Sequence, residues 1–177
     1  MPIQTAVSWL PDKYIVGQPW GMQPKNDVTA TADVDADFGD GLVWAPGTSL
    51  EPTGNRPKVK LPAANTENFA GILLLEHKQP RGEEADIATL VDTQTSRAYA
   101  KEPWTIRRQG CAVVRTEEVV VPGDAVFLIV GGALIGKWRK TARGTATETM
   151  AIPRARWVTV SVSEGGILKA VLELNLP

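Results

Sequence analysis

Proline is concentrated in the first third of this 177-residue chain, where eight of the thirteen prolines lie within residues 1–62. Proline has no amide hydrogen and a fixed φ, so this density forbids helices and long central strands there. The same segment carries Trp9, Trp20 and Trp44, and a solvated linker seldom carries so many indoles. We therefore expect residues 1–65 to form an extended arm with short strands. Its aromatic side chains would be buried against the chain's own core or a neighbouring chain.

The pattern changes after this segment, where short runs rich in Val, Ile and Leu alternate with Gly, Pro and Asp. Such spacing is typical of antiparallel β structure. The runs predicted as strands are 69–76, 103–109, 111–116, 124–130, 134–140, 156–162 and 167–175. Residues 163–166 predict a hairpin loop between the last two runs, and residues 122–124 predict a tight turn into a buried strand. The sequence therefore predicts an all-β fold, a barrel or sandwich over residues 66–177. One short helix is expected at 83–91.

Composition excludes several classes of protein. Hydrophobic residues make up 43% of the chain and charged residues 22%, which is ordinary globular usage and excludes a disordered or fibrous chain. A net charge of −1 argues against electrostatic binding of nucleic acid over the whole protein surface. The apolar runs are too short to span a membrane, and the Met-Pro start carries no signal-peptide pattern. One cysteine and one histidine exclude an internal disulfide, a multi-cysteine zinc site and a His-rich metal site.

The segment 131–137 fits the first seven positions of a phosphate-binding loop. Trp138, however, stands where Ser or Thr would hold magnesium, and the residues that follow lack the apolar stripe of the required helix. We therefore interpret the segment as a glycine hairpin between Phe127 and Trp138, and we expect no bound cofactor.

Asp33, Asp35 and Asp37 match the first three ligands of a calcium loop. Phe38 stands where the loop needs glycine, and Trp44 stands where it needs a bidentate glutamate. An irregular calcium site stays open as an alternative, but a solvated acidic edge or a docking patch fits the segment better.

Two reactive residue types remain. His77 follows an apolar run, and no nucleophile or orienting acid is identified beside it by spacing. Cys111 begins a Val-rich strand and is expected to be a small buried hydrophobe. No catalytic residue is predicted.

Charge is divided between two segments. Residues 26–41 carry five aspartates and no basic residue, and residues 137–156 carry six basic residues against Glu148 alone. Ordinary surface scatter would account for this. The sharper interpretation is complementary docking, within the chain, between subunits or on a partner protein. A nucleic-acid patch is weaker, because only Trp138 and Trp157 lie near enough to stack on bases. The candidate docking residues are Asp33, Asp35, Asp37, Lys137, Arg139 and Arg154.

The order of several short motifs resembles the structural cement proteins of tailed phages, which decorate the outside of icosahedral capsids. The motifs are FAGI (69–72), GCAVV (110–114), VPGDAV (121–126), GKW (136–138), IPRARW (152–157) and EGGI (164–167). The opening Met1–Gln4, followed by a lead rich in proline and glycine, is also similar. The acidic segment and residues 81–97 lie outside this resemblance.

The resemblance implies a non-enzymatic virion protein, made in the host cytoplasm and placed on the outer capsid surface. It would bridge neighbouring major capsid proteins as a homo-oligomer, with a trimer favoured, and bind neither nucleic acid nor membrane. The arm would lie along the capsid or an adjacent protomer, anchored by Trp9, Leu10, Tyr14 and Trp20. Two alternatives stay open. One is a ligand- or glycan-binding β-module of a phage fibre or tail that uses tryptophans as stacking platforms, and the other is a small hydrolase without a recognised signature.

Overall fold

The computed structural model describes residues 15–21, 24–46, 57–75, 97–98, 100–101, 103–143 and 148–176. Within these residues the chain forms fourteen strands and no helix, which confirms the all-β class. The strands are β1 (Pro19–Trp20), β2 (Asn26–Ala32), β3 (Ala36–Asp37), β4 (Gly41–Trp44), β5 (Lys58–Lys60), β6 (Phe69–Leu73), β7 (Arg97–Ala98), β8 (Pro103–Thr116), β9 (Phe127–Ile129), β10 (Trp138–Arg139), β11 (Thr149–Ala151), β12 (Ala155–Trp157), β13 (Val162–Glu164) and β14 (Ile167–Asn175). No helix long and apolar enough to cross a membrane occurs in this described part.

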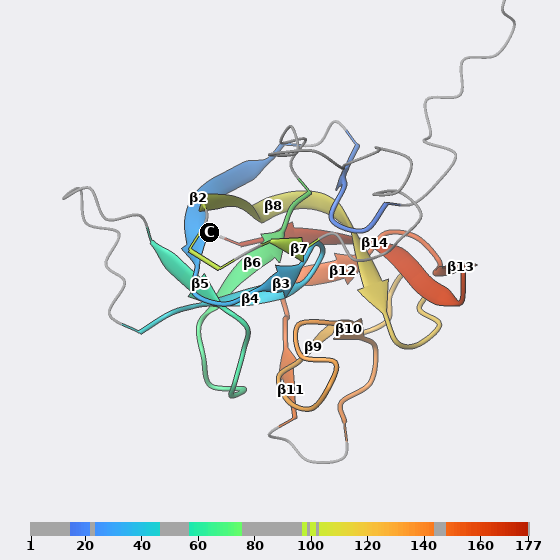
Figure 1. Ribbon diagram of the computed structural model, residues 1–177. Coiled ribbons are helices and arrows are strands. Elements are labelled where there is room, and N and C mark those ends of the chain that lie inside the picture. The colour runs from blue at the N-terminus through green and yellow to red at the C-terminus, as the bar shows by residue number, and fades with distance from the viewer. Residues whose placement is uncertain are drawn as a thin grey trace, which may run out of the picture.

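Five of the strands close into a barrel. Strands β2, β5, β4 and β6 lie side by side, and β8 pairs with both β2 and β6. Figure 1 shows β9, β10 and β11 below this barrel, and β14 with β12 and β13 on its right. Strands β3 and β7 pair separately. The pairing is antiparallel, as predicted, except that β5 runs parallel to β2 and β10 runs parallel to β8.

Strand β8 joins the barrel to the rest of the sheet. The sequence predicted two strands, 103–109 and 111–116, but the chain continues through Gly110, whose φ is 105°. Gln109 pairs with Asn26 of β2 on one side and with Asn175 of β14 on the other. The first half of β8 therefore belongs to the barrel, and its second half pairs with β1, β10 and β14.

Two apolar clusters lie on opposite faces of β4 and β6. Leu42 and Leu73 belong to the cluster that all five barrel strands supply, together with Ala30, Val59, Trp104 and Ile106. Val43 and Ile72 belong to the second cluster, together with Leu128, Trp138, Trp157, Leu172 and Leu174. Because both faces of these strands are buried, their sequence is a continuous apolar run and not an alternating one.

The C-terminal region corrects one predicted strand. Strand β14 has the predicted bounds, but the run 156–162 is divided into β12 and β13. Between them the chain turns toward Val120, whose carbonyl accepts the Ser161 amide at 3.0 Å and whose amide donates to Ser161 Oγ at 3.1 Å. Val160 and Val162 are consequently about half exposed and do not line the core.

The described part of the predicted arm lies in the sheet. Strands β2, β4 and β5 precede residue 66, yet β2 pairs with β8, β4 pairs with β6, and β5 lies between β2 and β4. Strands β4 and β5 end two residues before Pro46 and Pro62, and β2 begins two residues after Pro24, so the prolines flank these strands without preventing pairing. The expected helix at 83–91 and the anchors Trp9, Leu10 and Tyr14 lie outside the described residues.

The close approach of β6 to β8 at Gly71 gives the first prediction. Gly71 has a φ of 151°, and a Cβ there would lie 2.3 Å from the Arg107 carbonyl oxygen. The Gly71→Ala substitution should therefore lower the free energy of unfolding by roughly 2–4 kcal/mol, because β6 must move away from β8. Gly131→Ala is the control, since its nearest heavy atom would be 3.9 Å away. Denaturant unfolding that finds the two variants equally stable would contradict this account of barrel closure.

Candidate functional site

A buried charge cluster joins the acidic and basic segments. Lys137 Nζ lies 2.8 Å from Asp37 Oδ2 and 2.6 Å from Asp40 Oδ1. The side chains of Lys137 and Asp40 are only 8% and 4% exposed. Asp37 ends β3, Asp40 closes the turn that leads into β4, and Lys137 directly precedes β10. We call these three residues the Lys137 cluster.

Local geometry brings these segments into contact. The Asp37 amide donates to Asp40 Oδ2 at 3.1 Å, which fixes the acidic turn. The Gly41 amide donates to the Gly136 carbonyl at 2.9 Å, and the buried Trp138 indole Nε1 donates to the Gly39 carbonyl at 2.9 Å. Strands β9 and β10 pair with Trp138 opposite Leu128, so the predicted glycine hairpin is confirmed. The loop 131–137 therefore holds the acidic turn in place.

The remaining candidate docking residues lie in different places. Asp35 Oδ1 accepts the Ala100 amide at 2.8 Å, and Asp33 lies 3.8 Å from Lys58 at the surface. Arg139 is bound to Glu118, whose carboxylate also accepts the Lys140 and Thr141 amides. Asp37 and Lys137 thus form one ion pair of limited exposure within the chain. Arg139 forms another with Glu118. The acidic and basic segments therefore contact each other within one chain, through Asp37, Asp40 and Lys137.

The other residues singled out in the sequence have structural surroundings. Cys111 is buried, and burial raises the pKa of its thiol. Among the described residues, no group of three or more His, Cys, Asp or Glu is arranged to hold a metal ion. Trp20 is half-buried and packs against Cys111, Val113 and Val171 of its own chain. His77 lies outside the described residues.

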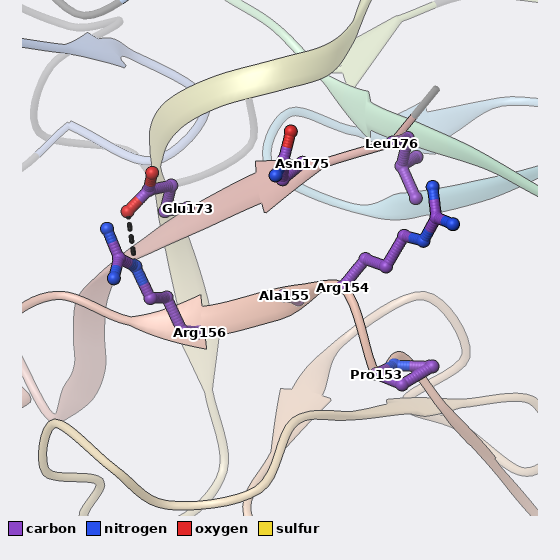
Figure 2. Close-up of a pocket in the computed structure, with 7 residues that line it drawn as sticks. All are labelled: Pro153, Arg154, Ala155, Arg156, Glu173, Asn175 and Leu176. Atoms are coloured by element: carbon purple, nitrogen blue, oxygen red, sulfur yellow. Dashed lines mark hydrogen bonds and ion pairs between the residues drawn. The ribbon is translucent and has the colours of Figure 1, made fainter.

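A second site, open to solvent, lies where β12 meets β14. It is a depression of about 520 Å³ lined by Pro153, Arg154, Ala155, Arg156, Glu173, Asn175 and Leu176. We call it the arginine pocket. Figure 2 shows Arg156 against Glu173 at one end and Arg154 extended toward Leu176 at the other.

Strand register creates this pocket. Arg156 is opposite Glu173, and the Arg154 carbonyl accepts the Asn175 amide at 2.9 Å. Residues two apart on a strand share a face, so the side chains of these four residues lie on the same side of the strand pair. Arg156 Nε donates to Glu173 Oε2 at 2.6 Å, and this bond raises the pKa of the guanidinium.

Sequence reasoning identified only part of these two sites. Arg154 was a candidate, whereas Glu173 and Asn175 were not, because their proximity depends on the β12–β14 register. Asp40 was counted in the acidic segment but not as a partner of Lys137. The only signal for that pairing was the opposite charge of two segments that lie far apart in the chain.

The Lys137 cluster predicts a large loss of stability when its cation is removed. Lys137→Met should lower the free energy of unfolding by roughly 3–5 kcal/mol, because it leaves the buried Asp40 carboxylate without its cation. Adding Asp40→Asn should recover part of that loss. Lys58→Met is the matched control, because Lys58 and Asp33 are 57% and 43% exposed and such pairs contribute about 1 kcal/mol or less. Equal losses in the two single variants, measured by denaturant unfolding, would overturn the role of the cluster.

The same cluster predicts a pH dependence. Burial raises the pKa of Asp40 from 3.8 to about 6, against the opposing effect of Lys137; Asp37 adds a smaller raising effect. The folded state therefore holds this proton more tightly than the unfolded state. Its contribution to stability is complete below pH 3.8 and is lost as the pH rises to about 6.

Asp40→Asn provides the comparison, because the amide side chain at position 40 cannot titrate. Over that pH window the wild type should lose roughly 1–3 kcal/mol of unfolding free energy relative to the variant. Chemical denaturation at several pH values measures the difference. A constant difference, or one that changes in the opposite direction, would refute the assignment.

Comparisons with known proteins agree with this architecture. The chain matches the family model described as structural cement protein (E217 gp24/Pam3 gp6) over residues 3–173. No curated protein matches it. A chain of the solved structure titled "The capsid of Myoviridae Phage XM1" is similar, with a TM-score of 0.62 and 17% identity over 99% of this chain and 98% of that chain. At that identity the likeness shows the fold alone. Because the family match covers residues 3–173, this chain belongs to the structural cement protein family.

Proposed function

We propose that this chain decorates the outer surface of a phage capsid and cements it by bridging neighbouring major capsid proteins. The observation that supports this proposal is the family match over residues 3–173. Membership of the family supports a structural role in the capsid, and the outer position and the bridging are our extension of it. The proposal assigns no catalytic residue and no cofactor.

The physical mechanism is mass action. A protein that binds the assembled shell but not its separated subunits shifts the equilibrium toward the shell. A molecule with several weak contacts on neighbouring subunits gains further, because the first contact raises the effective concentration for the next. A decoration protein therefore stabilises the shell without changing the capsid protein itself.

An exposed apolar cluster supports contact with another protein. Val119 and Val121 are 57% and 43% exposed, and Val160 and Val162 are 52% and 45% exposed. The hydrogen bonds between Val120 and Ser161 bring the two segments together. Grouped exposed apolar side chains are typical of protein contacts. We propose a homo-oligomer, with a trimer favoured.

The N-terminal residues are the proposed anchors. Trp9, Leu10 and Tyr14 precede the described residues, and we assign them to contact with a neighbouring protein. Trp20 differs from them, because one side of it already packs on its own chain. Only its exposed edge is available to a partner.

The glycan-binding alternative finds little support in the described tryptophans. Trp104, Trp138 and Trp157 are at most 5% exposed, and they pack in the apolar clusters. A sugar-stacking platform needs an exposed aromatic face. Trp20 and Trp44 are the described indoles with partial exposure.

Heating of capsid shells tests the proposal. Shells prepared without this protein should disrupt at a higher temperature after the purified chain is added, because the chain binds only the assembled form. Deletion of residues 2–14 should leave the unfolding temperature of the free protein unchanged but weaken shell binding about tenfold. Shells that neither bind the wild type nor gain stability would refute the cementing function. Full binding by the deletion variant would refute only the role of the N-terminal anchors.

A further inference from the structure

The arginine pocket contains a cation with no partner among the described residues. Arg154 is exposed and forms no ion pair or side-chain hydrogen bond in this part of the chain. Lys137 and Arg139, the other two basic docking candidates, already contact carboxylates in the chain. Arg154 therefore differs from both, because its five guanidinium N–H donors are available to an external acceptor.

Arg156 forms one hydrogen bond to Glu173 and is still largely exposed to solvent. Its Nε donates to Glu173 Oε2, and its exposed fraction is 72%. Figure 2 shows the other two guanidinium nitrogens without a marked contact. Glu173 balances one of the two arginine charges, so the pocket retains a net charge of +1. One further carboxylate would neutralise it.

The walls restrict the kind of ligand. Pro153, Ala155 and Leu176 line the pocket beside the two guanidinium groups. Guanidinium binds carboxylate in a bidentate geometry, and apolar walls suit the stem of an Asp or Glu or an apolar neighbour in the same peptide. A nucleic-acid backbone suits this pocket less well. The Glu173 carboxylate would repel successive phosphates, and Arg154 and Arg156 are the cations among the lining residues.

We propose that the arginine pocket receives an acidic side chain from a surface segment of the capsid protein, with Arg154 as the principal contact. This inference rests on the proposed function. The strand pair β12–β14 supplies a rigid frame for the pocket, since β14 is hydrogen-bonded along its length to β8. The docking geometry therefore exists before the partner arrives, and little ordering of the pocket is needed on binding.

Charge reversal at Arg154 tests the inference. Purified wild-type protein and the variants Arg154→Glu and Arg154→Ala are titrated onto shells that lack the protein, and bound protein is measured after sedimentation. We expect Arg154→Glu to weaken binding about tenfold or more and Arg154→Ala to weaken it less, because only the former adds repulsion. Binding by both variants should also depend less on salt than wild-type binding does.

Arg143→Glu is the matched control. It makes the same change of charge in the same basic segment, but Arg143 is paired with Glu148 at the surface, away from the pocket. We expect its binding to stay within about twofold of the wild type. Unchanged unfolding temperatures for all variants establish that any loss belongs to binding and not to folding.

The outcomes separate the two claims. Failure of the wild type to bind shells refutes the proposed function and this inference with it. Wild-type binding with equal behaviour of Arg154→Glu and Arg143→Glu refutes the inference alone. A single-stranded DNA oligonucleotide provides the other arm, read by fluorescence anisotropy. Binding of that oligonucleotide by the wild type, lost in Arg154→Glu, would overturn the assignment to an acidic peptide.

Discussion

Backbone hydrogen bonds on both edges of β8 hold the molecule together. One edge binds β2, β1 and β10, and the other binds β6 and β14. Because Gly110 lets this strand bend without ending, the same strand closes the barrel and carries the C-terminal strands. The arginine pocket depends on this arrangement, since β14 is hydrogen-bonded along its length to β8. A protein that bridges others benefits from such a frame, because a rigid surface loses little entropy on docking.

Ion pairs within the chain add to the hydrogen bonds of β8 in holding the fold together. The Lys137 cluster connects the turn before β4 with the loop before β10, and its Lys137 and Asp40 side chains are shielded from solvent. Two strongly charged segments therefore neutralise each other in part before any partner binds. The exposed charge that remains at Arg154 gains importance, because little else from the basic segment is both cationic and unpaired in the described structure.

Much of the fold could be predicted from the sequence, and the failures have local causes. Strand β14 was predicted with its observed bounds because its apolar residues alternate beside a Gly-Gly hairpin. Gly110 was interpreted as a strand end, since glycine at the end of a strand and glycine at a bend look alike in one dimension. The run 156–162 alternates equally well, but the contact of Ser161 with Val120 interrupts its pairing with β14 between β12 and β13. Long-range pairs such as Lys137 with Asp40, and Arg156 with Glu173, required the register of strands that are distant in sequence.

The central claim is that β8 makes the barrel and the C-terminal strands one cooperative unit. Native-state hydrogen exchange of the β8 amides tests it most directly, with Ile106 reporting on the barrel and Val114, which is paired with Ala170 of β14, reporting on the β14 side. The account predicts that both amides exchange only through global unfolding, with equal free energies of opening that fall in parallel as denaturant is added. Exchange of Val114 at a much lower opening energy than Ile106, through separate loss of β14, would contradict it.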